Sequence, residues 1–327
     1  ALLHYRSGGF YVHRAGQVPG HDPVRDVLLG VVAATEEPIS GGRHKVFGRH
    51  SLAVIPQTST IASHLPRAVG VAFSIARSRK LGVDGPWPRD AVTVCSFGDA
   101  SVNHSTAQGA INAAVQIGYR GLPVPLLFVC EDNGIGISVP TPEGWIGQSL
   151  GHRPGLEYFV ADGSDPEESV RVSQEAAAWV RRHRRPALLH LRTVRLMGHA
   201  GSDVETAYRS RDVIATDLGR DPILGTARLL IEAGVLTAED VVTRYEAAKE
   251  HVRSVAAEVA ELPQLDSAAA VAAPLRLPPV EVVERLAQGS ASPERRREIF
   301  GPGLPESEGH LTLAQAINRS LLDIFAQ

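Results

Sequence analysis

The chain alternates between short apolar runs and longer stretches in which apolar residues recur at helical spacing. Continuous apolar runs, typical of buried strands, occupy residues 91–97, 124–130, 157–161 and 187–194. Helical spacing occupies residues 62–81, 104–118 and 165–184. Strands that alternate with such helices predict an α/β domain with a mainly parallel sheet and helices on both faces.

The pattern changes after the last of these strands. Residues 222–261 carry Leu, Val and Ala at helical spacing with a break near Gly234 and Thr237, which predicts two helices that cap the sheet domain. Residues 262–310 are rich in proline and clustered charges, and predict a linker with one short helix. Thr312 is the expected cap of a further helix. The predicted divisions are an α/β domain at 1–221, a helical extension at 222–261, a linker at 262–310 and a new helix at 311–327.

Composition excludes several classes of protein. The 327 residues are 43% hydrophobic and 21% charged, as in ordinary globular chains, and the net charge of −3 gives no attraction to nucleic acid or to an acidic membrane. Cys95 and Cys130 lie in apolar runs, which predicts buried free thiols in a reducing compartment. No apolar run is long enough to span a membrane, and no signal segment opens the chain. The start at Ala1, without an initiator Met, indicates a truncated N-terminus.

Polar residues follow two of the predicted strands, at the point where each strand ends. The first set is Gly98-Asp99-Ala100-Ser101 and the second is Glu131-Asp132-Asn133. If the two strands are neighbours, Asp99 and Asn133 converge at the carboxyl edge of the sheet, where ligands bind. Small residues at such a turn let backbone N–H groups approach a phosphate, and Asp99 could bind Mg²⁺ carried by that phosphate. The alternative is that Asp99 caps a helix and that Asp132 and Asn133 are turn residues.

These residues resemble the thiamine-diphosphate fingerprint, in which Gly-Asp-Gly is followed at a distance by Asn-Asn. The surroundings are closer still to the alpha chain of the thiamine-dependent first component of 2-oxo acid dehydrogenase complexes. Besides the fingerprint, three motifs agree with that family in sequence and order: HYRSGGF, IPQTSTIASHLPRAVGVAFS and TVRLMGHAGSDVETAYRS. The final LTLAQAINRSLLDIFAQ resembles the opening of the same component's beta chain. The resemblance therefore implies the alpha-like part of a bacterial fused alpha–beta protein, in the cytoplasm.

The resemblance assigns roles to particular residues. The Mg²⁺ ligands would be Asp99, Asn133 and the backbone carbonyl of Ile135. The diphosphate would be bound by Tyr5, Arg6, Gly98, Ala100, Ser101 and Arg195. The aminopyrimidine would meet Ser59 and Ile61, with Ile61 supporting the ring. His199, on a Gly-rich loop after a strand, would be the active-site histidine.

The implied activity is that of the decarboxylating component of such a complex. It forms a thiamine-bound acyl carbanion from a 2-oxo acid and transfers the acyl group to a lipoyl-lysine of the acyltransferase. In this family a glutamate of the beta chain activates the cofactor, and no residue here matches it. The active protein is therefore expected to be a heterotetramer or a dimer of fused chains, with its partner supplying that glutamate.

Departures from the family pattern leave the substrate open. Ala100 replaces a glycine and Asp132 replaces the first asparagine of the pair. Glu131 stands where branched-chain enzymes often have arginine and pyruvate-type chains often have glutamate. Similarity over 133–141 favours branched-chain 2-oxo acids. The alternatives are a pyruvate or acetoin dehydrogenase component and, from a different class, a non-catalytic scaffold subunit.

Overall fold

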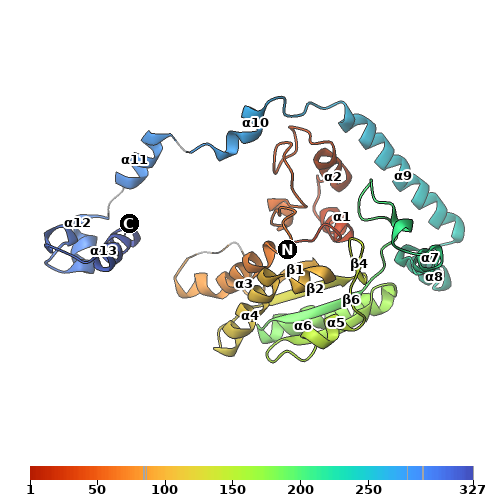
Figure 1. Cartoon of the computed structure of the whole chain (residues 1–327), viewed down its shortest axis with the longest axis horizontal. Helices are drawn as coiled ribbons and strands as arrows, with labels where there is room; N and C mark the ends of the chain where they lie inside the picture. Colours follow the sequence, from red (N-terminus) through yellow and green to blue (C-terminus); the bar gives the residue numbers. More distant parts are fainter. Residues whose placement is uncertain (84, 86, 278, 289–290, 327) are drawn as a thin grey trace. The chain divides into compact units, whose positions relative to one another are not determined.

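The computed structural model describes residues 1–83, 85, 87–277, 279–288 and 291–326 (Figure 1). The chain forms two compact units, Ala1–Leu265 and Asp266–Gln327. Within the described residues, no helix is both long and apolar enough to cross a membrane.

A four-stranded parallel sheet forms the centre of the first unit. In spatial order its strands are β1 (Thr93–Gly98), β2 (Leu126–Asp132), β6 (Ala187–Arg192) and β5 (Glu157–Asp162). All neighbouring pairs are parallel, so the carboxyl ends of the four strands lie along one edge. β1 and β2 are direct neighbours, with Gly98 opposite Glu131. The four predicted strands are confirmed. The strands that precede Asp99 and Asn133 are neighbours, which was the condition for both residues to lie at one edge of the sheet.

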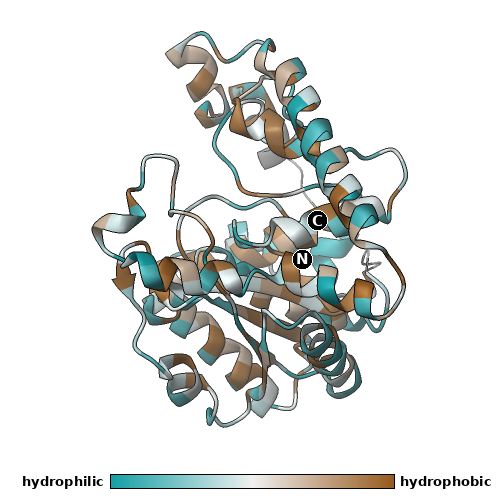
Figure 2. Cartoon of the chain, turned by 90° about the vertical axis from the view of Figure 1, so that its right-hand side faces the viewer, coloured by the Kyte–Doolittle hydropathy of each residue, from teal (hydrophilic) through white to brown (hydrophobic). Residues whose placement is uncertain are grey.

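Helices cover both faces of this sheet. One face carries α3 (His64–Lys80), α4 (Ser105–Tyr119) and α5 (Trp145–Leu150), and the other carries α6 (Pro166–His183). Along β2, Phe128 packs on the α3–α4 side and Leu127 on the α6 side, because successive side chains of a strand point to opposite faces. The strands are therefore apolar on both sides, and appear largely brown in Figure 2. The predicted α/β class is confirmed.

Further elements surround this core. Those that the hydrophobic pattern missed are α1 (Gly8–Gly16), α2 (Pro23–Val31), α7 (Arg211–Gly219), the hairpin β3 (Ile135–Gly136) and β4 (Val139–Pro140), and the 3₁₀ turns η1 (His50–Leu52), η2 (Asp99–Asn103) and η3 (Glu205–Ala207). The two helices predicted after residue 222 are α8 (Pro222–Glu232) and α9 (Ala238–Ala260). Helix α8 contacts α6, whereas α9 packs through Val255 and Val259 on Leu29 of α2.

The second unit is more helical than the predicted linker with one short helix. It contains α10 (Ala268–Ala272), η4 (Ala273–Leu275), α11 (Val280–Gln288), α12 (Pro293–Phe300), η5 (Pro305–Ser307) and α13 (Leu313–Phe325). Thr312 caps α13 in a reciprocal capping box with Gln315, as expected. Arg296 of α12 forms ion pairs with Glu306 and Asp323, which tie α12 to α13. The assignment of residues 311–327 to a beta-like domain stays a prediction.

Candidate functional site

A cavity of about 860 Å³ opens at the carboxyl edge of the sheet. It gathers most of the predicted site residues, which come from five separate parts of the sequence. These are Tyr5, Arg6, Ser59, Ile61, Gly98, Asp99, Ala100, Ser101, Ile135 and His199. Asn133 and Arg195 are not part of this lining. Tyr5 and Ile61 remain 45% and 44% exposed although both are large, so they present apolar surface to the cavity.

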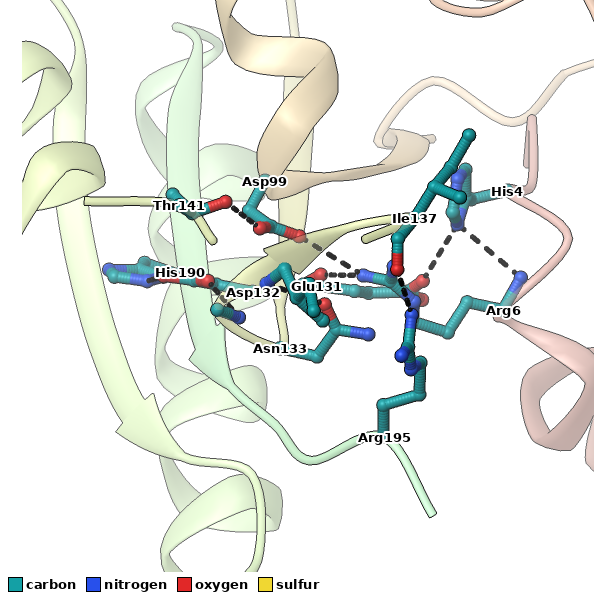
Figure 3. Close-up of polar contacts among 12 residues, drawn as sticks. His4, Arg6, Asp99, Glu131, Asp132, Asn133, Ile137, Thr141, His190 and Arg195 are labelled. Atoms are coloured by element: carbon teal, nitrogen blue, oxygen red, sulfur yellow. Dashed lines mark hydrogen bonds and ion pairs between the residues drawn. The ribbon is translucent and has the colours of Figure 1, made fainter. Parts of the chain in front are cut away.

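Asp99 is the buried acid of the cavity. It opens η2 directly after β1, and its side chain is completely buried. Its Oδ2 accepts a hydrogen bond from the Thr141 hydroxyl, and its Oδ1 lies 3.5 Å from Nη1 of Arg6 (Figure 3). An ionised carboxylate has room for about four such bonds, and the longer contact is at the limit of hydrogen bonding. The carboxylate therefore keeps acceptor capacity for a cation.

The turn after β2 carries the second predicted metal ligand. Asn133 is half-buried, and its Oδ1 accepts the N–H of Ile135 at 3.3 Å, while Gly134 takes a positive φ of 72°. This is the local bonding expected of a turn residue. Ile135 itself is buried and lines the cavity. The structure places the turn beside the Asp99 segment (Figure 3), and metal binding by Asn133 and Ile135 stays a prediction.

A glycine on the neighbouring hairpin accommodates the alanine of the Gly-Asp-Ala sequence. A Cβ added to Gly136 would lie 2.6 Å from the Cβ of Ala100, so the two residues fit together only because position 136 is glycine. At Gly98, an added Cβ would approach Nη1 of Arg6 to 3.3 Å. Glycines at these two positions allow the Asp99 turn to meet both the β3–β4 hairpin and the Arg6 guanidinium.

A buried polar cluster anchors the segment that carries Tyr5 and Arg6. The backbone N–H of His4 donates to Oγ of Ser96 at 2.8 Å, and the Ser7 hydroxyl donates to Oε1 of Glu131 at 2.5 Å. The backbone N–H of Arg6 donates to Nδ1 of His4, which lies 3.5 Å from Oε2 of Glu131, and the Arg6 guanidinium donates to the Glu131 carbonyl (Figure 3). Glu131 is therefore an anchor for the N-terminal segment and lies outside the cavity lining.

The loop after β6 presents His199 to the cavity. Its backbone N–H donates to Oδ2 of Asp203 at 2.6 Å, and the Tyr208 hydroxyl donates to the same oxygen. These two bonds, that of Tyr208 first, lower the pKa of Asp203. The His199 ring meets the Tyr5 ring edge-on at 6.0 Å. His199 is thus exposed at the cavity while its backbone is fixed by the loop.

Arg195 connects this loop to the β3–β4 hairpin. Its Nη1 donates to the carbonyl of Ile137 at 2.5 Å, and its Nη2 donates to the Tyr208 hydroxyl at 2.6 Å and to Glu205 at 3.2 Å. Its buried Nε has no hydrogen-bond partner within the described part of the chain. The guanidinium of Arg195 is therefore hydrogen-bonded to protein groups in this structure. Its contact with a phosphate stays a prediction.

A second cluster of hydrogen-bonded polar side chains, behind the site, was not predicted from the sequence. His190 of β6 bonds Asp132 at 2.8 Å through Nε2 and Tyr158 of β5 at 2.7 Å through Nδ1. Burial opposes the ionisation of Asp132, but the bonds from His190 and from the Gly134 N–H outweigh it and lower the pKa of Asp132. The available signal was a histidine inside the apolar run ALLHL.

The lining combines two kinds of chemistry. Arg6, Asp99 and the backbone of 98–101 suit a phosphate with a divalent cation, whereas an apolar wall suits a ring or an aliphatic group. That wall is formed by Val27, Val31, Val46, Phe47 and Ile61. Over the described residues no group of three or more His, Cys, Asp and Glu could hold a metal ion. A cation beside Asp99 would therefore need amide, carbonyl and ligand oxygens, such as those of a diphosphate.

Comparisons with known proteins agree with this chemistry. The model of the family "Dehydrogenase E1 component" matches residues 4–267. The alpha subunit of 2-oxoisovalerate dehydrogenase from Bacillus subtilis (strain 168) is 28% identical over 221 residues, which cover 66% of this chain and 62% of that protein. The mitochondrial alpha subunit from Caenorhabditis elegans is 31% identical over 192 residues, covering 58% and 41%. The mitochondrial alpha subunit 2 from Arabidopsis thaliana is 30% identical over 167 residues, covering 50% and 32%. The matches span less than two thirds of the length of these relatives.

Proposed function

Since the chain belongs to the dehydrogenase E1 component family, we propose that it is the alpha-type part of a thiamine-diphosphate-dependent decarboxylase of a 2-oxo acid dehydrogenase complex. In this proposal the acyl product passes to a lipoyl-lysine of the acyltransferase. The observation that carries the proposal is the single cavity in which Asp99, the 98–101 turn, Arg6 and His199 lie together.

The residues present fit thiamine diphosphate and Mg²⁺. Asp99 has spare acceptor capacity, and it would hold the cation together with Asn133 and the Ile135 carbonyl. Arg6 would neutralise the phosphates, and the short side chains at 98–101 leave backbone N–H groups accessible. When bound, the cofactor supplies the electron sink for decarboxylation.

The chain's own residues have separate tasks around that chemistry. Ile61 presents apolar surface to the cavity, which would orient a ring and exclude water. His199 is exposed at the lining and would donate and accept protons during acyl transfer, as a positioned general acid–base. Tyr5 contacts its ring edge-on and would limit its rotation. Asp203 would keep the loop in place by accepting the backbone N–H of His199. Tyr208 would support it by donating to the same carboxylate oxygen.

A beta-type partner is part of the proposal. No described residue in the cavity lining is a glutamate, so an acid that activates the cofactor would come from another chain or domain. Helix α13 supports an additional domain, because its large apolar residues are exposed. These are Leu313, Ile317, Leu321, Leu322, Ile324 and Phe325.

Branched-chain 2-oxo acids are the proposed substrates. The apolar wall of Val27, Val31, Val46 and Phe47 supports an aliphatic substrate side chain, and the relatives above are named for 2-oxoisovalerate. Glu131 does not argue for a pyruvate-type enzyme, because here its carboxylate accepts the Ser7 hydroxyl and its backbone carbonyl accepts the Arg6 guanidinium.

Turnover by the assembled protein tests the proposal. Rates with 2-oxoisovalerate, pyruvate and acetoin should be measured separately, with Mg²⁺, thiamine diphosphate and a lipoyl domain as acceptor. We expect 2-oxoisovalerate to have the highest kcat/KM. Preference for pyruvate or acetoin would refute the proposed substrate class. If the protein binds these compounds without the cofactor and turns over none of the three, a scaffold subunit would be favoured.

A further inference from the structure

Three side chains form a hydrogen-bonded row across the sheet behind the β2 turn. The Tyr158 hydroxyl of β5 lies 2.7 Å from Nδ1 of His190 on β6, and Nε2 of His190 lies 2.8 Å from Oδ2 of Asp132 at the end of β2. His190 is only 6% exposed, so the row is shielded from water. A neutral His190 ring with its proton on Nε2 satisfies both contacts, because it accepts from Tyr158 and donates to Asp132.

Asp132 connects this row to the turn. Its Oδ1 accepts the N–H of Gly134 at 2.9 Å, and its backbone carbonyl accepts the N–H of Thr193 at 2.6 Å. Asn133 lies between the two bonded residues, and Gly134 has a positive φ of 72°. One carboxylate therefore fixes the turn from within and attaches it to the neighbouring strand (Figure 3).

We infer that Asp132 and its partner His190 are positioning residues that set the affinity of the Asn133–Ile135 turn for a divalent cation bound with a diphosphate. The inference rests on the proposed function, because it takes Asn133 and the Ile135 carbonyl as cation ligands. Groups that orient metal ligands without touching the metal commonly alter metal affinity about 10–100-fold when removed. His190 and Asp132 would act in this way, because they orient the turn around Asn133 through the hydrogen bonds of Asp132 and are not themselves proposed ligands.

Position 132 allows a conservative rescue. An asparagine there keeps an oxygen for the Gly134 N–H and offers an N–H₂ group to His190, whose ring proton can move to Nδ1. Asp132→Asn should therefore keep cofactor affinity close to that of the unsubstituted protein. Asp132→Ala removes both bonds and should weaken it about 10–100-fold.

The two nitrogens of His190 allow a second, independent comparison. A glutamine amide can occupy the place of Nε2 and retain the bond to Asp132. An asparagine amide reaches only the place of Nδ1 and retains the bond to Tyr158. His190→Gln should therefore keep more of the cofactor affinity than His190→Asn, although both remove the ring from the same buried site.

Asp162 provides a matched control. It ends β5, it opposes Arg192 in the ladder as Asp132 does, and its Oδ1 accepts the N–H of Ser164 at 3.0 Å. Asp162→Ala thus removes an equivalent turn bond at a strand end outside the cavity lining. It should lower the melting temperature without changing cofactor affinity.

The experiment is calorimetric titration of thiamine diphosphate at fixed Mg²⁺ into the assembled protein, with melting temperatures for each variant. Weakened affinity in Asp132→Ala and His190→Asn, with retention in Asp132→Asn, His190→Gln and Asp162→Ala, is expected. Affinity unchanged in Asp132→Ala would overturn the inference and leave the proposed function standing. If Asp132→Ala does not fold, equal affinities for the His190 pair would overturn it instead. No binding by the unsubstituted protein would overturn the proposed function and this inference with it.

Discussion

Replacement of Gly136 by alanine should destabilise the turn that carries Asp99. An ideal Cβ at position 136 lies 2.6 Å from the Ala100 Cβ, whereas favourable contacts between carbon atoms begin at about 3.5 Å, an overlap of about 1 Å. Gly136 is not among the glycines with positive φ, so alanine is compatible with its backbone conformation. Ala100 cannot easily retreat, because Asp99 and Ser101 on either side of it are buried. The clash is therefore the main effect of the substitution.

Overpacking of this kind costs about 1–3 kcal/mol. The single change Ala100→Gly should cost less than about 1 kcal/mol, because Ala100 is exposed and the loss is mostly backbone entropy. In the double variant Gly136→Ala, Ala100→Gly the two β-carbons no longer meet. The double variant should therefore regain most of the lost stability, with a coupling free energy of about 1–3 kcal/mol.

Urea unfolding followed by circular dichroism, on the unsubstituted protein and the three variants, measures this coupling. A parallel titration with thiamine diphosphate and Mg²⁺ should show weakened binding only in Gly136→Ala, because the clash displaces Asp99. A Gly136→Ala variant as stable as the unsubstituted protein, or a double variant no more stable than Gly136→Ala, would show that the two β-carbons do not clash.

Three further predictions concern His199, His64 and Glu131. His199→Ala should slow acyl transfer to a lipoyl domain about 10²–10⁴-fold in single-turnover assays while cofactor affinity is kept. Burial lowers the pKa of His64, whose ring bonds the Ser96 carbonyl at 2.7 Å. As pH falls, the His64 ring is therefore protonated in the unfolded chain before it is protonated in the folded protein. The stability of the protein should then fall as pH drops below about 6.5 towards the folded pKa, and His64→Gln should show a smaller fall in urea unfolding. Glu131→Ala removes the charged acceptor of the buried Ser7 hydroxyl, whose remaining partner is the Ser96 hydroxyl, and should cost about 1–3 kcal/mol in urea unfolding, whereas Glu143→Ala, at an exposed position, should change stability little.

Each of these has a contrary result. Unchanged lipoyl acylation in His199→Ala would remove that residue from the reaction. Equal pH dependence with and without His64 would place the acid sensitivity elsewhere. Equal stability of the Glu131 and Glu143 variants would show that the His4–Ser7 segment is held by other contacts.

Much of the fold could be predicted because the strands and the longer helices have strong local patterns. The β2 run of Leu126–Cys130 is apolar on both faces, and α6 begins at an Asp165-Pro166 cap whose side chain accepts two backbone N–H groups. Helix α1 was missed because its buried residues Tyr11 and Ala15 pack on Leu52 and Val54, which lie far away in the sequence. Local periodicity carries no trace of such distant contacts.

The site could be predicted in part for the same reason. Asp99 follows from its place at a strand end, but the direction of a side chain depends on its partners in space. Arg195 bonds Glu205 and Tyr208 of the following loop and lies outside the cavity lining. His190 was missed because a single histidine in an apolar run is ordinarily part of the core, and its pairing with Asp132 requires the strand order.

The proposed cofactor site is tested most directly by titration of thiamine diphosphate into the assembled protein, with Mg²⁺ or with excess EDTA, for the unsubstituted chain and for Asp99→Asn. We expect saturable binding at one site per alpha-type chain, which is lost in EDTA and lost in Asp99→Asn at unchanged melting temperature. Binding that survives both EDTA and Asp99→Asn, or no binding by the unsubstituted protein, would contradict it.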